Sequence, residues 1–227
     1  KIVFASSAAV YGDDENAPPV KPIREDCTPR PISCYGRTKL AAEQMLSDMA
    51  SHDQIGVVIL RLFNVAGAMP EHDLGEWHDP ETRLISRMLR DRHVTIYDGG
   101  LSHALDCSPI RDYVHVRDVA SAFMASLDAV VPGQVKTYNV GSGRGHTALE
   151  ITEFAQAFLP DLRVDQGPRR EGDVQSAVAD ISRIQAELGW APQRSDIRNI
   201  LHTAAVWEKR RQQLADEAKD GAASVQD

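Results

Sequence analysis

The sequence predicts an α/β fold in which short parallel strands are joined by helices. Two observations carry this prediction: short apolar runs alternate with amphipathic segments, and turns that contain Gly or Pro separate them. The chain has 227 residues, of which 42% are hydrophobic and 26% are charged. These proportions are those of a globular protein that buries a core. No linker divides the chain, so we expect any second domain to be interleaved with the first.

Each element rests on its own pattern. The apolar run Val57–Leu62 is typical of a strand buried on both faces of a sheet. Apolar residues at helical spacing, among them Met45 and Met49, indicate a helix over 35–50. Thr147 and Glu150 have the spacing of a capping box. We expect strands at 2–5, 57–62, 94–97 and 137–140, and helices at 35–50, 83–90, 116–130, 148–159, 182–188 and 197–214. The proline-rich stretch 17–31 predicts a loop, and the polar residues 215–227 predict a flexible tail.

Composition argues against several classes of function. The 33 acidic residues outnumber the 25 basic ones, and a net charge of −8 disfavours binding to nucleic acid or to an anionic membrane. We find neither an apolar run long enough to span a bilayer nor a secretory signal. Three cysteines without a CxxC pair predict reduced thiols and a cytoplasmic location, and the eight histidines lack the spacing of a metal site. The chain opens with Lys1 directly on a strand pattern, so we expect an N-terminal part to be missing.

Two polar motifs occupy positions where chemistry is expected. Ser6 and Ser7 follow the first expected strand, at the carboxyl end where open α/β sheets bind ligands. Tyr35 and Lys39 lie four residues apart on one face of a helix. A phenol is a poor base at neutral pH, but a neighbouring ammonium favours the phenolate, so such a pair suits acid/base chemistry on a substrate hydroxyl. Taken singly, each motif is also compatible with an ordinary turn or a solvated surface pair.

In chain order, the motifs resemble a known family. A serine at a strand end followed by a YxxxK helix is typical of the short-chain dehydrogenase/reductases. Further motifs follow in order: FASSAAVYG at 4–12, LRLFNVAGA at 60–68, GEWHDPETRLI at 75–85, RDYVHV at 111–116 and PRREGD at 168–173. The set is similar to the extended branch of that superfamily, and most closely to its enzymes that epimerise UDP-hexoses at C4.

The resemblance implies a fold, a cofactor and a substrate. The fold would be the C-terminal part of a doubly wound Rossmann-type parallel sheet with an interleaved smaller α/β substrate domain. Residues 1–67 and 112–140 would be the remaining part of an NAD-binding domain, and 68–111 and 141–214 a UDP-sugar-binding domain. The implied reaction interconverts UDP-glucose and UDP-galactose by transient oxidation at sugar C4, with NAD as cofactor and a homodimer as the assembly.

The same resemblance implies a role for individual residues. Tyr35 matches the catalytic base, Lys39 the lysine that binds the nicotinamide ribose, and Ser7 the hydroxyl that bonds the sugar O4. Cofactor contacts would come from Ser6, Tyr35, Lys39 and Phe63. Substrate contacts would come from Asn64, Arg83, Leu84, Thr95, Tyr97, Arg111, Arg170, Asp173 and Ala177. Two arginines suit a diphosphate because the planar guanidinium meets phosphate oxygens bidentately.

Alternatives to these roles stay open at this point. Arg111 and Arg170 could be surface charges paired with Asp112 and Glu171, and Arg169 could take the place of Arg170. The segment GSGRGHT at 141–147 is similar to a dinucleotide-binding loop, but His146 stands where the third glycine belongs. We therefore interpret that segment as a tight turn.

The sequence also departs from the family pattern. The family's glycine-rich pyrophosphate loop would lie before Lys1, so this segment alone is expected to fold poorly and to be inactive. Arg83 stands where Asn or His is usual and could add a phosphate contact or crowd the site. Ala177 stands where a tyrosine often narrows the sugar pocket, which predicts tolerance of N-acetylhexosamine nucleotides. Rival interpretations are a UDP-N-acetylglucosamine 4-epimerase, a UDP-glucuronate epimerase or decarboxylase, and a non-catalytic nucleotide-sugar-binding fragment.

Overall fold

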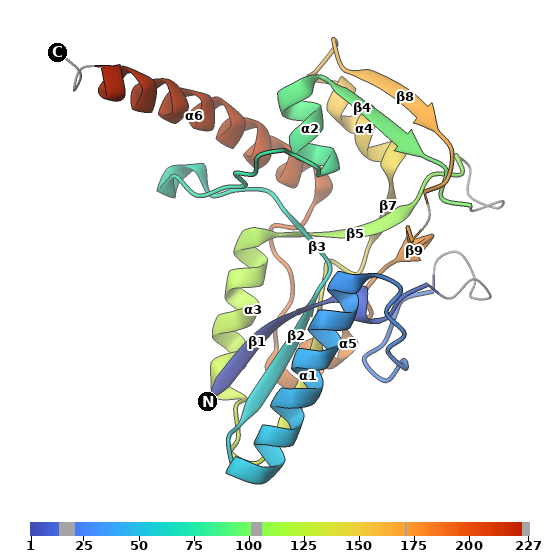
Figure 1. Ribbon diagram of the computed structural model, residues 1–227, viewed down its shortest axis with the longest axis vertical. Coiled ribbons are helices and arrows are strands. Elements are labelled where there is room, and N and C mark those ends of the chain that lie inside the picture. Colours follow the sequence, from blue (N-terminus) through green and yellow to red (C-terminus); the bar gives the residue numbers. More distant parts are fainter. Residues whose placement is uncertain (14–20, 101–105, 171, 224–227) are drawn as a thin grey trace.

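The computed structural model describes residues 1–13, 21–100, 106–170 and 172–223, and Figure 1 shows its architecture. The lower part is a three-stranded parallel sheet with strand order β1 (Ile2–Ser7), β2 (Val57–Leu62) and β6 (Val135–Val140). Helix α1 (Cys34–Asp53) packs on one face, and α3 (Val116–Asp128) and α5 (Ser182–Leu188) pack on the other. The predicted α/β class, with a doubly wound Rossmann-type parallel sheet, is confirmed.

The central strand β2 is buried on both faces, as its continuous apolar sequence predicts. Val58 and Leu60 pack with Val119 of α3, whereas Ile59 packs with Ala50 of α1. Successive side chains of a strand point to opposite faces, so one apolar run supplies the core on both sides of the sheet.

The upper part is a helical layer beside a two-stranded parallel sheet (Figure 1). The helices are α2 (Leu84–Asp91), α4 (Ala148–Gln156) and α6 (Ile197–Ala223), and the strands are β4 (His93–Tyr97) and β8 (Arg163–Gly167). Met88, Ile151 and Ile200 are fully buried where the three helices meet. The upper part therefore has a hydrophobic core of its own.

A third small sheet connects the two parts. In it β5 (Ile110–His115) pairs with β3 (Asn64–Ala66), β7 (Gly145–Thr147) and β9 (Ser176–Ala177). Two short 3-10 helices complete the secondary structure of the described residues, η1 (Ala8–Val10) and η2 (Pro70–His72). Because β3 follows β2 directly in the chain, it leads from the lower sheet toward the upper part.

Most predicted elements are present, with ends shifted by a few residues. Thr147 caps α4, since its hydroxyl accepts from the Glu150 N–H at 3.1 Å, while the Glu150 carboxylate lies 3.1 Å from His146 instead of completing the box. Helix α6 continues to Ala223, beyond the predicted end at Leu214, because Ala, Glu and Lys in this stretch favour helix. The predicted loop at 17–31 lies partly outside the described residues.

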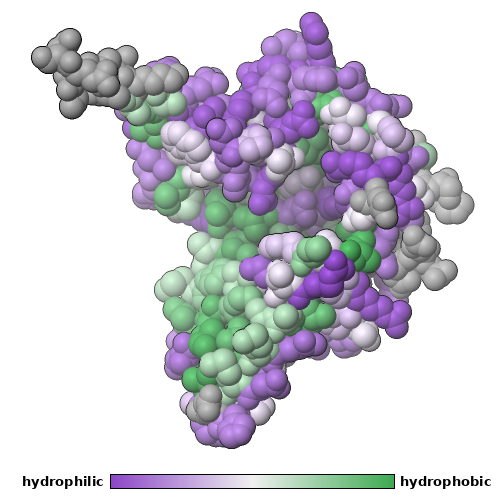
Figure 2. Space-filling view, in the orientation of Figure 1, coloured by the Kyte–Doolittle hydropathy of each residue, from purple (hydrophilic) through white to green (hydrophobic). Residues whose placement is uncertain are grey.

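Strand β1 lies at an edge, because among the described strands it pairs only with β2. Apolar side chains are exposed on both helices that cover it, with Met45 of α1 and Met124 of α3 each 66% exposed. Figure 2 shows hydrophobic surface gathered on this lower part, whereas the upper part is mostly hydrophilic. Within the described residues, no helix is both long and apolar enough to cross a membrane, and no group of acidic, His or Cys side chains has a metal-binding arrangement.

Candidate active site

The first group of polar residues lies at the carboxyl end of β1. The Ser7 hydroxyl caps η1 by accepting from the Ala9 N–H at 3.2 Å, and Ser33 caps α1 by accepting from the Gly36 N–H at 3.0 Å. A Cβ on Gly36 would lie 2.3 Å from the Ala9 carbonyl oxygen, so only glycine allows α1 to begin against η1. This close approach sets Tyr35 and Ser7 on adjoining turns.

Lys39 stands beside the phenol of Tyr35. Its Nζ donates to the Ala5 carbonyl oxygen at 2.9 Å and lies 5.7 Å from the centroid of the Tyr35 ring. Tyr35 is 55% exposed, so its hydroxyl is accessible to a bound molecule. An accessible phenol next to an ammonium can exchange a proton with a substrate hydroxyl.

A buried ion pair fixes α1 behind these residues. The Arg61 guanidinium of β2 meets the Glu43 carboxylate of α1, with Nη2 to Oε2 at 2.7 Å and Nε to Oε1 at 3.1 Å. Ser6 donates its hydroxyl to the same carboxylate and is buried, so its side chain is directed into the protein. Burial alone would lower the pKa of Arg61, but the bond to Glu43 raises it above its ordinary value. Since Tyr35, Lys39 and Glu43 repeat every four residues, this pair sets the face that α1 presents to the sheet.

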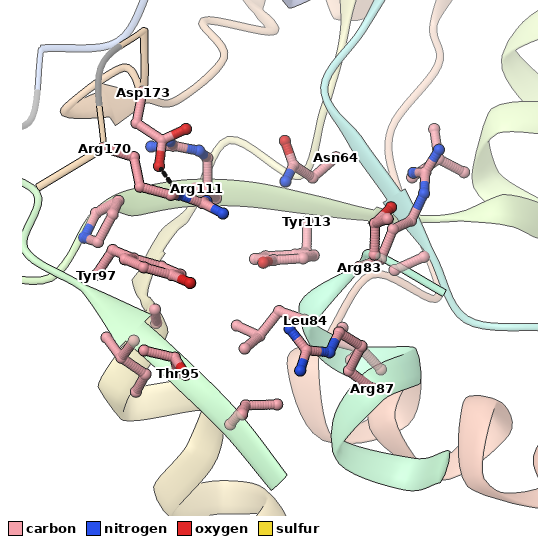
Figure 3. Close-up of a pocket in the computed structure, with 18 of the residues that line it drawn as sticks. Asn64, Arg83, Leu84, Arg87, Thr95, Tyr97, Arg111, Tyr113, Arg170 and Asp173 are labelled. Carbon is pink, nitrogen blue, oxygen red and sulfur yellow. Dashed lines mark hydrogen bonds and ion pairs between the residues drawn. The ribbon is translucent and has the colours of Figure 1, made fainter. Parts of the chain in front are cut away.

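The second group forms a cavity of about 220 Å³ between β3, β4, β5 and the start of α2 (Figure 3). It brings together residues that are far apart in the sequence. Eight of the nine residues predicted to contact substrate line it: Asn64, Arg83, Leu84, Thr95, Tyr97, Arg111, Arg170 and Asp173. Sequence reasoning missed Glu76, Arg87 and Tyr113, which line the same cavity. Alternation along β5 would have found Tyr113, since residues two apart on a strand face the same side as Arg111.

Arg111 does not pair with its neighbour Asp112. The Asp112 carboxylate is fully buried and accepts from the N–H groups of Ser142 at 2.7 Å, Gly143 at 2.9 Å and Ala179 at 3.1 Å. Burial raises the pKa of Asp112, and desolvation lowers the pKa of Arg111. The surface-pair interpretation of Arg111 is therefore excluded: Arg111 lines the cavity, and its Nη1 donates to the carbonyl oxygens of Ile110 at 2.9 Å and Gln175 at 3.4 Å (Figure 3).

The glycine-rich segment at 141–145 is the tight turn that we expected. Its N–H groups at Ser142 and Gly143 are occupied by Asp112, and a Cβ on Gly141 would lie 2.5 Å from that carboxylate. A phosphate-binding loop needs such N–H groups free for its ligand. The turn thus stabilises β5 rather than presenting an anion site.

Arg170 lies over an aromatic ring. Its guanidinium is 4.1 Å from the Tyr97 ring centroid, and its Nε donates to the Asp173 Oδ2 at 2.8 Å. The alternative partner, Glu171, lies outside the described residues. Arg169 does not line the cavity and instead lies 3.5 Å from Asp13. Between the two arginines, the geometry therefore favours Arg170 as the cavity residue.

Arg83 is held by a carboxylate of the same cavity. Its Nε lies 2.6 Å from the Glu76 Oε1, and the Ser86 hydroxyl donates to the other Glu76 oxygen at 2.6 Å. Four arginines (Arg83, Arg87, Arg111 and Arg170) and two acids (Glu76 and Asp173) line the cavity, a surplus of four minus two, or two, positive charges. Such a surplus suits a ligand that carries about two negative charges.

Ala177 and Phe63 lie between the two groups. Phe63 is buried in a cluster with Val10 and Tyr11, and Ala177 packs against that cluster. Ala177 is also in register with Arg111, through the pairing of β9 with β5. It does not line the cavity itself, but it lies next to Arg111, which does.

The model of the family described as "NAD dependent epimerase/dehydratase family" matches residues 1–141. The chain belongs to this family. The UDP-glucose 4-epimerase of Lactobacillus helveticus is 37% identical over 215 residues, which are 92% of this chain and 64% of that protein. UDP-arabinose 4-epimerase 1 of Arabidopsis thaliana is 34% identical over 92% of this chain and 51% of its own length. The chain thus spans between about half and two thirds of these relatives.

Solved epimerase structures share the fold. UDP-glucose 4-epimerase from Bifidobacterium longum, in complex with NAD+ and UDP, superposes with a TM-score of 0.82 at 29% identity, over 92% of this chain and 63% of that one. The enzyme from Stenotrophomonas maltophila, with bound NAD and formylated UDP-arabinopyranose, has a TM-score of 0.81 at 30% identity, over 93% and 64%. The resemblance to enzymes that epimerise UDP-hexoses at C4 is therefore confirmed.

Proposed function

We propose that the intact protein interconverts UDP-glucose and UDP-galactose by transient oxidation at sugar C4. The observation that carries the proposal is the cavity, because residues spread from Asn64 to Asp173 line it together and leave a surplus of positive charge. The sequence relatives and solved structures named above support the same reaction. An alternative of another class is a non-catalytic nucleotide-sugar-binding protein, and only turnover separates the two.

We assign the proton transfer to Tyr35. As the phenolate it takes the proton from the sugar 4-OH, and it returns that proton when the sugar is reduced on its other face. Lys39 stabilises the phenolate through its ammonium, 5.7 Å from the ring centroid. Ser7 donates its hydroxyl to the sugar O4. Its Oγ already accepts from Ala9, so its own proton is available for that bond.

The UDP part would occupy the cavity. Arg111 and Arg170 bind the diphosphate, Asp173 the uridine ribose, and Leu84, Thr95 and Tyr97 the uracil. At present the Arg170 guanidinium covers the Tyr97 ring, which is the flat surface that a base would stack on. Uracil would replace it there and release Arg170 toward the phosphates. While these contacts hold UDP in place, the sugar can rotate and present either of its faces to the nicotinamide.

The residues present fit the nicotinamide end of NAD. When bound, NAD would supply reversible hydride transfer at sugar C4. Tyr35 and Lys39 lie at the carboxyl end of β1, where open parallel sheets bind such ligands. The side chains of Ser6 and Phe63 are both buried, and the predicted contacts of these residues with NAD stay part of the proposal.

The test is epimerisation of UDP-galactose by the intact protein. We expect turnover, and we expect Tyr35→Phe to lower kcat by at least about a hundredfold while UDP affinity, measured by calorimetry, stays unchanged. Tyr35 is exposed and its ring is not part of the core, so folding should not be affected. Intact protein that binds UDP without turnover would support the non-catalytic alternative, and unchanged kcat in Tyr35→Phe would place the base elsewhere.

We further propose that N-acetylhexosamine nucleotides are accepted, because the small side chain of Ala177 stands where the resemblance implies a tyrosine that narrows the sugar pocket. Ala177→Tyr should lower kcat/KM for UDP-N-acetylglucosamine by about 10- to 200-fold and affect UDP-glucose far less. Ala177→Ser is the matched control and should keep both activities. Equal losses for both sugars in Ala177→Tyr would contradict the proposal. UDP-arabinose should be assayed as a third substrate, because one relative is named UDP-arabinose 4-epimerase 1.

We also propose a homodimer in the cytoplasm. Met45 and Met49 are exposed on α1 and offer an apolar helix face to a second copy. Cys27, Cys34 and Cys107 are free thiols, as expected in a reducing compartment.

A further inference from the structure

A second cavity lies at the C-terminal end of α2 and shares no lining residue with the first, which lies at the N-terminal end. Its volume is about 680 Å³, and it is bordered by the ends of α2 and α4 and by the middle of α6. This size is in the range of pockets that hold small organic ligands, roughly 300–1,000 Å³. Neither the proposed reaction nor the nucleotide assignment uses it.

The wall of this cavity is mainly apolar. Leu89, Phe154 and Leu201 lie at its base, and Phe158 and Val206 are 45% and 41% exposed on it. Two exposed apolar side chains facing one concave surface can release water when a hydrophobic group covers them. The apolar part of a ligand could therefore cover this exposed apolar wall.

Cations without acidic partners stand around that wall. Nη1 of Arg92 is buried and has no hydrogen-bond partner among the described residues. In the same described part of the chain, no carboxylate lies within ion-pair distance of Arg92 or Lys209, and both line the cavity. A buried donor without a partner costs free energy, which a ligand acceptor can recover.

The acids of the cavity do not balance these cations. Both carboxylate oxygens of Glu208 are held by Arg211, at 2.5 and 2.8 Å. Glu153 is exposed, and the remaining cation, Arg198, stacks 4.9 Å from the Phe154 ring centroid. The cavity therefore combines an apolar wall with a positive edge.

We propose that this cavity binds an amphipathic monocarboxylate, an aliphatic chain or aromatic ring that carries one carboxylate. The apolar part would cover Phe154, Phe158 and Val206, and the carboxylate would accept from the half-buried Arg92, with Lys209 on the same lining. A guanidinium suits a carboxylate because the two groups form a planar, charge-assisted pair. The limited volume and an unpartnered guanidinium nitrogen on the lining residue Arg92 favour a small molecule over a docked protein helix.

The test uses decanoate, below its micelle concentration, as the probe and calorimetry on the intact protein. We expect saturable binding with one site per chain, and decanol, which lacks the charge, should bind more weakly. Arg92→Gln should weaken decanoate binding about tenfold or more, as expected for loss of one charge-assisted pair. The matched control Arg144→Gln removes an exposed arginine from the turn after β6 and should change nothing.

A second variant tests the same cavity in case Arg92→Gln does not fold. Ala157→Trp places a large ring at the exposed mouth of the cavity and should abolish decanoate binding while leaving the circular dichroism spectrum unchanged. Undiminished binding in both Arg92→Gln and Ala157→Trp would overturn the proposal. So would the absence of decanoate binding, including the case in which an acidic amphipathic helical peptide binds in its place, which would make the cavity a protein-docking groove.

Discussion

At the scale of single residues, buried ionisable groups show how the fold constrains chemistry. His115 is 2% exposed and caps α3: its Nδ1 accepts from the Arg117 N–H at 3.0 Å, and its Nε2 lies 3.1 Å from the Thr203 hydroxyl. An accepting Nδ1 puts the single proton of the neutral ring on Nε2. Burial lowers the pKa of His115; the Asp118 carboxylate opposes this effect and the cations Arg194 and Arg117 add to it, with a net lowering that favours the neutral ring.

This titration predicts a loss of stability in acid. Because the pKa of His115 is lower in the folded than in the unfolded protein, the unfolded chain takes up the proton first as the pH falls below about 6.5. The free energy of unfolding should therefore be constant above that pH, as far as His115 is concerned, and decrease below it. His115→Asn keeps a good helix cap without the titration. Urea unfolding of both proteins between pH 7.5 and 5 should show the smaller decrease in the variant, and parallel curves would contradict the assignment.

At the scale of elements, the position of α1 is the central feature. Glu43 and Arg61 join α1 to β2 with side chains only 5% and 8% exposed, and Gly36 brings the start of α1 against η1. A buried carboxylate that meets both an arginine and Ser6 fixes the rotation of α1 about its axis. Lys39 and Tyr35, one and two turns earlier on the same face, follow that rotation.

Removing one charge of this pair should be costly. Glu43→Gln leaves a buried guanidinium without its counter-ion, and we expect the free energy of unfolding to fall by about 3–5 kcal/mol. Glu71→Gln is a matched control, because Glu71 and Arg117 form a pair that is half exposed, and its loss should cost about 0–1 kcal/mol. Chemical denaturation of the intact protein measures both. Equal losses in the two variants would show that the buried pair does not hold α1.

Elements with a clear period were predictable, and elements without one were not. β2 and α5 have the predicted bounds because an apolar run marks the strand and Gly189 ends the helix in a left-handed conformation. The strands β5 and β8 were missed. Arg111 and Asp112 interrupt the apolar pattern of β5, and β8 carries a single half-buried apolar side chain, Val164. Their strand structure comes from pairing with distant segments, which no local pattern records.

At the scale of the whole molecule, the sequence predicted which residues matter better than where they lie. Family motifs pointed to eight residues that the fold gathers in one cavity, but the roles of these residues stay predictions. Local patterns could not show that Glu76 holds Arg83 or that Arg170 covers Tyr97, since both contacts depend on tertiary packing.

A protein of these 227 residues alone should associate. β1 has a free edge among the described strands, and Met45 and Met124 are exposed on the two helices beside it. Such an edge with apolar flanks is a site for pairing between chains. Light scattering after gel filtration should show species larger than a monomer, and Met45→Lys with Met124→Lys should reduce them. The control is Lys136→Gln, which changes a half-buried polar side chain of β6. A monomer at all concentrations would contradict this expectation.

Helix α2 has a consequence for both cavities. Its first turn, with Leu84 and Arg87, lines the cavity assigned to UDP, and its last turn, with Leu89 and the following Arg92, lines the cavity assigned to a carboxylate. The helix has only eight residues, so a shift at one end moves the other end as well. Thermodynamic linkage is reciprocal: if occupancy of one cavity changes affinity in the other by some factor, the reverse effect has the same factor. The binding affinities of two ligands that never touch would then be coupled through a rigid helix of about two turns.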